Sequence, residues 1–227
     1  MSKMERIICL AIGYIFGLFQ TSYIYGKIKH VDIREYGSGN AGTTNAMRVL
    51  GKKAGIITYF GDCFKAMFAG LLIWYIYRYH LGKPSDYVLM LRIYGGLGVI
   101  LGHNFPFYMG FKGGKGIAAS SGVIFGLGDL KIIALSWVIF LSVTFISKYV
   151  SLGSLVFMAC FLVEFICFNE FGILGFKNNT HITGSERIEV YILVVVIVAL
   201  AFIKHSANIK RLIAGNERKI GQKKEEV

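Results

Sequence analysis

The sequence has few prolines and few acidic residues, and several common catalytic patterns are absent from it. Only two prolines and 13 Asp and Glu residues occur among 227 residues, against 25 Lys and Arg residues. There is no Gly-x-Ser-x-Gly nucleophile elbow. No His is followed by Asp after four intervening residues, a common acid/base arrangement. These absences argue against catalysis by a dedicated serine nucleophile or by a His-Asp pair.

Cysteine chemistry and the usual nucleotide-binding loop are also absent. The four cysteines lie in apolar runs and lack metal-ligand spacing: Cys9, Cys63, Cys160 and Cys167. We therefore expect buried thiols, with neither a metal site nor a cofactor. A P-loop would need Gly in place of Met109 and Ser or Thr in place of Gly116, which excludes that motif. The first apolar run lacks a small-residue cleavage site, so we expect it to be retained as a membrane span.

Long apolar runs make up most of the chain. Hydrophobic residues account for 55% of it, and the mean hydropathy is +0.57. Runs of nearly 20 apolar residues recur, which is typical of a polytopic membrane protein. We expect one membrane-embedded domain over residues 1–227, with residues 215–227 as a flexible tail. The net charge of +12 then reflects cytoplasmic loops rather than a nucleic-acid partner.

The apolar pattern predicts an all-α protein with about seven transmembrane helices. They cover approximately residues 7–25, 54–77, 88–101, 116–127, 131–146, 151–168 and 190–203. With the N-terminus outside, seven spans place three polar segments and the C-terminus in the cytoplasm. Merging the fourth and fifth runs into one helix would leave six spans and move the last polar segment to the other side. We therefore favour seven.

The middle polar segment is rich in glycine and lysine. Lys112 and Lys115 flank Gly113 and Gly114, and Gly116 precedes an apolar run. The glycines disfavour helix and allow the backbone to approach a ligand closely. A helix beginning near Lys115 would present unpaired amides at its positive end, which favours phosphate. The alternative is a flexible basic loop between two spans.

The first polar segment combines a loop with a short predicted helix. Thr43 or Thr44 can cap this helix, and Gly51 can end it. Side chains that suit phosphate occur along the segment: Ser38, Asn40, Asn45 and Arg48. The alternative is a turn-rich cytoplasmic loop with ordinary positive charge.

The last polar segment predicts a helix with two different faces. His205, Asn208 and Arg211 share one face, whereas Ile209 and Leu212 lie on an apolar one. An amphipathic helix on the membrane surface would show the same pattern. In the second span, Asp62 and Lys65 are three residues apart and can pair, so we expect them to support the structure near a site.

These segments resemble the three signatures of bacterial acyl-phosphate:glycerol-3-phosphate acyltransferases. The first reads Ser-Gly-Asn-Ala-Gly-Thr-Thr-Asn followed by Arg48, with Thr43 where alanine is usual. The second reads Gly-His-Asn-Phe-Pro, then Phe-Lys-Gly-Gly-Lys-Gly. The third reads His-Ser-Ala-Asn-Ile-Lys-Arg-Leu, then Gly-Asn-Glu-Arg-Lys. Ala66 replaces the glycine of the family's Asp-x-x-Lys-Gly pattern in the second span. The resemblance covers nearly the whole chain.

The resemblance implies transfer of a fatty acyl group from acyl phosphate to the 1-hydroxyl of glycerol 3-phosphate. The products would be lysophosphatidic acid and phosphate, in the first step of phospholipid synthesis at the bacterial inner membrane. The implied catalytic residues are Ser38, Arg48, Lys115, His205 and Asn208. The implied substrate-binding residues are Asn40, Asn45, Lys112, Gly113, Gly114, Gly116 and Glu217.

Several alternatives stay open on the sequence alone. Either His205 or a substrate phosphate could act as the base. The enzyme that supplies acyl phosphate is an expected partner, beside membrane lipid. A small-anion transporter or a non-catalytic membrane scaffold would also explain the spans. The lack of an internal repeat argues against a transporter, and three polar segments on one face argue against a scaffold.

Overall fold

The computed structural model describes residues 3–172, 182 and 184–221, and its regular elements there are all helical. The longer helices are α1 (Lys3–Gly17), α4 (Lys52–Trp74), α5 (Ser85–Asn104), α6 (Ile117–Leu127), α7 (Leu130–Ser147), α8 (Val150–Glu170) and α9 (Gly184–Lys204). The short helices are α2 (Thr21–Ile28), η1 (Ile33–Glu35), α3 (Thr43–Leu50), η2 (Tyr75–His80), η3 (Phe107–Met109) and α10 (Ser206–Ile213). The predicted all-α class is confirmed.

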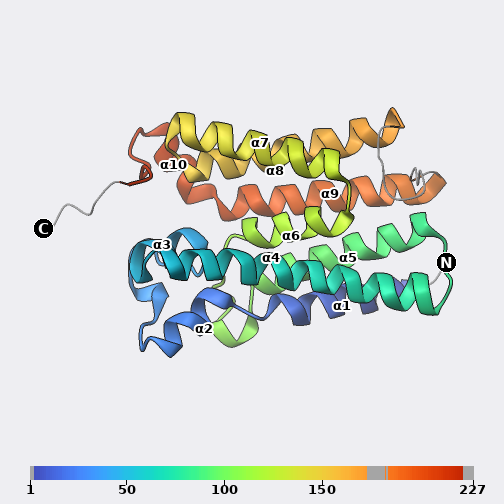
Figure 1. Cartoon of the computed structure of the whole chain (residues 1–227), viewed down its shortest axis with the longest axis horizontal. Coiled ribbons are helices and arrows are strands. Elements are labelled where there is room, and N and C mark those ends of the chain that lie inside the picture. The colour runs from blue at the N-terminus through green and yellow to red at the C-terminus, as the bar shows by residue number, and fades with distance from the viewer. Residues whose placement is uncertain (1–2, 173–181, 183, 222–227) are drawn as a thin grey trace, which may run out of the picture.

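The long helices lie side by side along the long axis of the molecule (Figure 1). Helix α1 leads away from the N-terminus to the opposite end, where α2 and α3 follow, and α4 returns. Helix α5 then comes back, so the loop between α5 and α6 lies beside α2 and α3. Helix α9 ends at that same end, where α10 begins. The three polar segments are therefore at one end, as predicted.

Not every predicted span is long enough to cross a membrane. Five segments have the required length and apolar composition: Lys3–Ile28, Lys52–His80, Ser85–Met109, Leu130–Ser147 and Val150–Glu170. A sixth is obtained if Glu186–Lys204 and Ser206–Ile213, bent by 59°, count as one span. Helix α6 has 11 residues, about 16 Å at 1.5 Å per residue, whereas the hydrocarbon core is about 30 Å thick. A helix is present at each of the seven predicted positions, but seven spans are not confirmed: five segments qualify, or six with the bent pair, and α6 is too short to cross by itself.

The alternative of one merged helix for the fourth and fifth apolar runs is wrong. Gly128 adopts a φ of +80° and ends α6. Asp129 then caps α7 by accepting hydrogen bonds from the amides of Lys131 and Ile132 at 2.9 and 3.1 Å. Helices α6 and α7 thus form a hairpin that returns the chain to the end with the polar segments (Figure 1).

The first span is broken, where we had expected one continuous helix over residues 7–25. Helix α1 ends at Gly17 and α2 begins at Thr21. The carbonyls at the break accept side-chain hydrogen bonds: Gly17 O from Gln20 at 3.2 Å, Leu18 O from Tyr108 at 2.6 Å and Phe19 O from Lys65 at 2.6 Å. Because a membrane offers no water to such groups, these bonds allow the break to exist.

Helices α1 and α5 pack closely because glycines line their contact. A Cβ atom at Gly98 would lie 2.1 Å from the Leu10 carbonyl oxygen, and one at Gly102 would lie 2.3 Å from that of Tyr14. One at Gly13 would lie 1.9 Å from the Gly95 carbonyl oxygen. Only glycine permits this approach, so these glycines set the distance between α1 and α5.

Candidate active site

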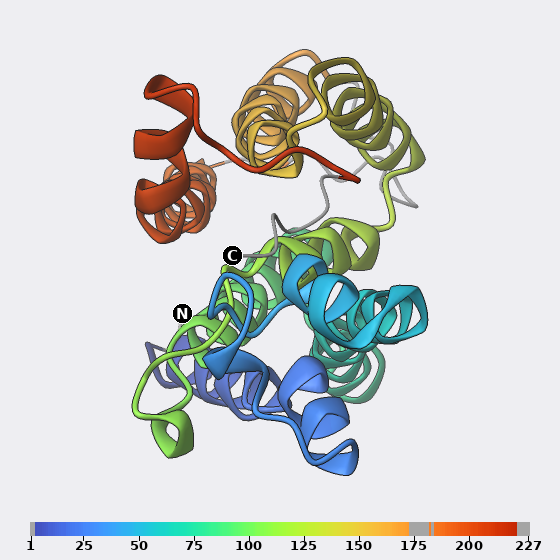
Figure 2. The ribbon, with the colours of Figure 1, turned by 90° about the vertical axis from the view of Figure 1, so that its left-hand side faces the viewer.

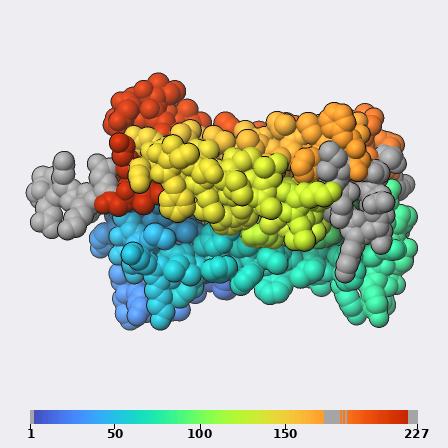
Figure 3. Space-filling model, turned by 45° about the horizontal axis from the view of Figure 1, so that its top comes forward, coloured from blue at the N-terminus to red at the C-terminus, as the bar shows by residue number. Residues whose placement is uncertain are grey.

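The three polar segments lie at the end of the bundle that faces the viewer in Figure 2. A Cβ atom at Gly114 would lie 2.7 Å from the Ala41 carbonyl oxygen, so the loop before α6 packs against the loop before α3. The C-terminal segment, red in Figure 3, covers the same end beside the cyan α3 region. Segments far apart in the sequence therefore build one site.

The first polar segment is shaped by Asn45. Helix α3 begins after Gly42, which replaces the expected threonine cap, and ends as predicted at Gly51, with a φ of +90°. The Asn45 amide is buried and donates to Ile33 O at 3.0 Å and Tyr36 O at 3.1 Å. Its oxygen accepts from the Ser38 amide at 2.8 Å. Asn45 thus holds the loop that presents the exposed Ser38, instead of offering its own amide to a ligand.

The second polar segment differs from the expected phosphate cradle. The amides of Gly113 and Gly114 donate to the carbonyls of Asn104 and His103, at 3.2 and 3.1 Å, and so are already used. A Cβ atom at Gly113 would lie 2.0 Å from the His103 carbonyl oxygen. These two glycines are needed for packing against the end of α5. Their predicted role as amide donors to phosphate is therefore corrected.

The backbone amides that remain available to a ligand begin at Gly116, at the start of α6. Gly116 has a φ of +84° and is the N-cap of α6. The amides of Gly116 and of the first helical residues lack an intrahelical acceptor by the geometry of an α-helix. They lie at the positive end of the helix dipole and next to Lys115, which is an arrangement that suits a phosphate group.

The third polar segment joins the second through a chain of hydrogen bonds. The Lys115 ammonium donates to Asn208 Oδ1. Asn208 Nδ2 donates to Glu217 Oε1 at 2.7 Å, and Arg211 Nε donates to Glu217 Oε2 at 2.7 Å. His205 and Asn208 are both buried. The predicted shared face of His205, Asn208 and Arg211 is present; His205 and Asn208 point into the protein, whereas the side chain of Arg211 is 40% exposed.

Glu217 anchors the segment that follows α10. Its carboxylate also accepts from Ser151 Oγ at 2.9 Å, and the Ile220 amide donates to the Lys148 carbonyl at 2.8 Å. Burial raises the pKa of Glu217, but hydrogen bonds from Asn208, Arg211 and Ser151 outweigh it and hold the pKa below its usual value. The expected flexible tail therefore starts too early at 215, since residues up to 220 are attached. Residues 222–227 lie outside the described part.

His205 is held in one tautomer. Its Nδ1 lies 2.7 Å from the Ala201 carbonyl oxygen. A carbonyl only accepts, so Nδ1 carries the proton, as assigned from this partner, and Nε2 of the neutral ring is an acceptor. The charges of Lys115 and Glu217 both act on the ring. His205 thus has the form that a proton acceptor requires.

The cations of the site act on one another. Burial lowers the pKa of Lys115 to about 8; Glu217 opposes this shift, whereas Arg211, Lys204 and Arg48 add to it. Arg48 in turn is within electrostatic reach of Glu217 and Arg211, so α3 faces α10 across the site. Like charges held together in this way favour an anionic ligand, which would stabilise the protonated form of Lys115.

The remaining predicted residues lie at the edge of the site. Lys112 is exposed, and Asn40 is partly buried, with its amide near Gly42. Sequence reasoning missed the role of His103, whose ring lies beneath Gly114. It also missed Gln20, whose amide donates to the His103 carbonyl at 2.9 Å. Polar side chains within apolar runs were the signal for both. The expected pair of Asp62 and Lys65 is present, with 2.9 Å between Oδ1 and Nζ.

This geometry defines a class of protein: a multi-helix membrane protein with a cation-rich group of side chains at one end. The comparisons with known proteins make it specific. The glycerol-3-phosphate acyltransferase family model matches residues 7–215. The glycerol-3-phosphate acyltransferase of Clostridioides difficile strain 630 is 39% identical, over 99% of this chain and 100% of the relative. That of Thermoanaerobacter sp. strain X514 is 38% identical, over 98% and 99%. The chain belongs to the glycerol-3-phosphate acyltransferase family.

Solved structures agree with this assignment. The crystal structure of PlsY (YgiH), an integral membrane glycerol 3-phosphate acyltransferase in its glycerol 3-phosphate form, is similar with a TM-score of 0.75 and 29% identity. The similarity covers 95% of this chain and 96% of the PlsY chain. Its lysophosphatidic acid form gives a TM-score of 0.73 and 28% identity, with 95% of each chain covered.

The lowered pKa of Lys115 leads to a pH prediction. As pH rises through about 8, the free enzyme loses this ammonium and with it an attraction for the substrate phosphate. We expect kcat/KM for glycerol 3-phosphate to fall above pH 8, by about tenfold per unit, because this ratio reports the free enzyme. In Lys115→Arg the charge persists, so the remaining activity should be lower but without this alkaline limb. An unchanged alkaline limb in Lys115→Arg would contradict the assignment.

Proposed function

We propose that this protein transfers a fatty acyl group from acyl phosphate to the 1-hydroxyl of glycerol 3-phosphate, yielding lysophosphatidic acid and phosphate. The observation that carries this proposal is the hydrogen-bonded chain from Lys115 through Asn208 to Glu217, beside the free amides of α6. Together with the His205 imidazole, which the charges of Lys115 and Glu217 reach, this arrangement suits an acyl donor that is already activated. Family membership supports an acyltransferase over the transporter and scaffold alternatives.

The reaction balances without a protein nucleophile. The 1-hydroxyl oxygen of glycerol 3-phosphate forms an ester bond to the acyl carbon, and the bond from that carbon to the phosphate oxygen breaks. The hydroxyl proton passes to a base, and phosphate leaves with the bonding electron pair. Catalysis then depends on holding both substrates in position and on stabilising the negative charge that develops on the carbonyl oxygen.

The residues divide between two phosphates. Glycerol 3-phosphate is proposed to bind where the three polar segments meet. The residues assigned to it come from all three segments: Ser38, Arg48, Lys115 and Asn208. The Gly116 amide and the first turn of α6 are proposed to bind the acyl-phosphate group, with Lys112 and Asn40 at the exposed side. His205 Nε2 is an acceptor in this structure, which supports it as the base. A substrate phosphate remains the other candidate for that role.

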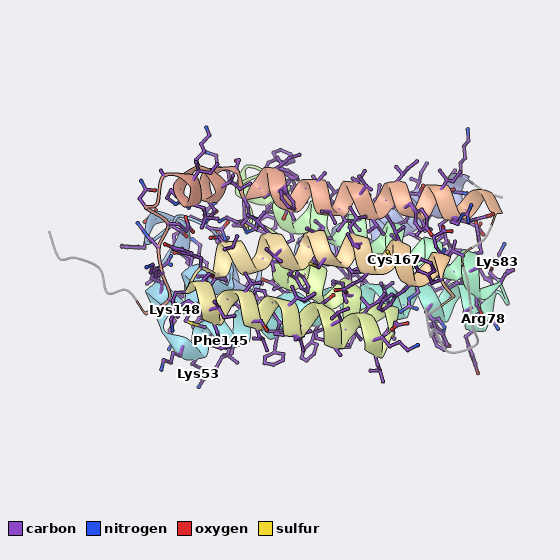
Figure 4. All side chains as sticks on the ribbon, turned by 90° about the horizontal axis from the view of Figure 1, so that it is seen from above. Lys53, Arg78, Lys83, Phe145, Lys148 and Cys167 are labelled. Carbon is purple, nitrogen blue, oxygen red and sulfur yellow. The ribbon has the colours of Figure 1, made fainter. Side chains whose placement is uncertain are left out.

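The charge distribution supports a cytoplasmic site. The end with the site carries many cations: Lys27, Lys29, Arg34, Arg48, Lys52, Lys53, Lys112, Lys115, Lys148, Lys204, Lys210, Arg211, Arg218 and Lys219. Among the described residues, Lys3, Arg6, Arg78, Lys83 and Arg187 lie at the other end, and Lys131 lies at the turn of the α6–α7 hairpin, away from the site. Figure 4 shows Lys53 and Lys148 at one end, and Arg78 and Lys83 at the other. By the positive-inside rule, we place the site in the cytoplasm of a bacterial cell and the N-terminus outside.

A labelling experiment tests this orientation. Leu81, between η2 and α5, and Lys53, at the start of α4, are both exposed and lie at opposite ends. In intact cells, a membrane-impermeant thiol reagent should label Leu81→Cys, and should label Lys53→Cys only after permeabilisation. The unmodified protein, with its cysteines in apolar runs, serves as the control. Labelling of Lys53→Cys in intact cells would invert the proposed orientation.

The choice of donor is the sharpest test of the function. A site without a serine nucleophile can do little to activate a poor donor, whereas acyl phosphate brings a good leaving group and an anionic handle. A site built for a buried polar group loses roughly 10⁴-fold when that group is missing. We expect acyl phosphate to react far faster than acyl-coenzyme A or acyl-carrier protein, and plain glycerol to be nearly inert as acceptor. Comparable initial rates with acyl-coenzyme A would contradict the proposed donor.

A further inference from the structure

A cluster of buried polar side chains lies directly beneath the site and is not used by the proposed chemistry. Lys65 of α4 is at its centre, 2.9 Å from Asp62 Oδ1 and 2.9 Å from His103 Nδ1 of α5. Its ammonium also donates to the carbonyls of Phe19 at 2.6 Å and Gly17 at 3.3 Å. Lys65, Asp62 and His103 are at most 5% exposed. We call these three residues the lysine hub.

The lysine hub holds the break between α1 and α2. The carbonyls of Gly17 and Phe19 belong to that break, and Thr21, the first residue of α2, donates to Asp62 Oδ1 at 3.1 Å. Helix α2 leads into the loop that carries Ser38. The direction in which the first polar segment leaves the membrane bundle is therefore set by contacts with Lys65 and Asp62.

The lysine hub also supports the loop between α5 and α6 that contains Gly113, Gly114 and Lys115, which we call the glycine loop. A lysine ammonium only donates, so His103 Nδ1 accepts from Lys65 and, in the neutral ring, Nε2 carries the proton. A Cβ atom at Gly114 would lie 2.1 Å from this Nε2 and 2.7 Å from the Ala41 carbonyl oxygen. The His103 ring thus lies where the loop before α3 meets the loop before α6. The His103 carbonyl also accepts the Gly114 amide at 3.1 Å.

We propose that Lys65, Asp62 and His103 are positioning residues. They set the position of the loop that carries Ser38 (residues 37–42) relative to the glycine loop that carries Lys115 (residues 110–116). This role deepens the proposed function, because the two loops bring together the residues assigned to the substrates. The lysine hub does not touch substrate, because it is buried beneath the Gly114 backbone. It acts by giving both loops one common support. A displacement of about 1 Å at a reacting centre can cost about 100-fold in rate.

The test separates positioning from simple stabilisation. Removing one partner of a buried ion pair strands the other charge, whereas replacing both by apolar residues is often neutral for stability. The informative variant is therefore the double change Asp62→Leu with Lys65→Met. We expect it to unfold cooperatively near the wild-type temperature, but with kcat/KM for glycerol 3-phosphate lowered by about 100-fold. Amide hydrogen exchange should accelerate in both residues 37–42 and residues 110–116.

The matched control is the ion pair between Arg6 and Glu189 at the other end of the bundle, with 2.5 Å between Nε and Oε1. The double change Arg6→Met with Glu189→Leu should leave both turnover and loop exchange as in wild type. His103→Leu, which keeps the pair of Asp62 and Lys65, should release both loops as the first variant does. If the double variant Asp62→Leu with Lys65→Met fails to fold, turnover and loop exchange in His103→Leu test the positioning role instead.

Wild-type turnover in a folded double variant, or unchanged exchange in both loops, would show that the lysine hub is only structural. Because exchange is measured without substrate, this result is independent of which acyl donor the enzyme uses. An enzyme that rejects acyl phosphate but shows loop release in the variants would contradict the proposed donor and support the lysine hub.

Discussion

The structure of the site depends on one contact, in which the glycine loop packs against the C-terminal end of α5. The amides of Gly113 and Gly114 pair with the carbonyls of Asn104 and His103, which have no acceptor role within α5 and also accept from Lys204 and Gln20. A membrane-embedded helix cannot leave such carbonyls exposed to lipid. The loop therefore folds back on α5, and this places Lys115 opposite Asn208 and directs the first turn of α6 toward the site.

The second constraint is electrostatic. The charges of Arg48, Arg211 and Lys204 act on Lys115, and the carboxylate of Glu217 opposes them. Glu217 is itself occupied by Asn208, Arg211 and Ser151. The site is thus left with an excess of positive charge that a phosphorylated substrate would balance. Burial is the main cause of the lowered pKa of Lys115, about 8, and the charges of Arg211, Lys204 and Arg48 add to it.

Much of the fold could be predicted from the sequence because its signals are local. Apolar runs placed the helices, Gly51 ended α3, and helical periodicity put His205 and Asn208 on one face. The pair of Asp62 and Lys65 followed from their spacing of three residues. These features depend on the chain near each residue, and the structure reproduces them.

The rest depends on contacts between distant segments, which the sequence does not display. The α1–α2 break is stabilised by Lys65 and Tyr108 from other elements. The glycines were interpreted as amide donors because nothing local shows that α5 already accepts from Gly113 and Gly114. Likewise, Glu217 was assigned both to substrate binding and to a flexible tail, since its bond to Ser151 crosses 66 residues.

The central claim is that one site is assembled from separate segments through Lys115 and Asn208. A double-mutant cycle with Lys115→Ala, Asn208→Ala and the combined variant tests it, with kcat/KM for glycerol 3-phosphate as the readout. The account predicts strong coupling, of about 1 kcal/mol or more, so that the combined loss is close to the larger single loss. Losses that add to within about 0.3 kcal/mol would show that the two residues act independently and would contradict the account.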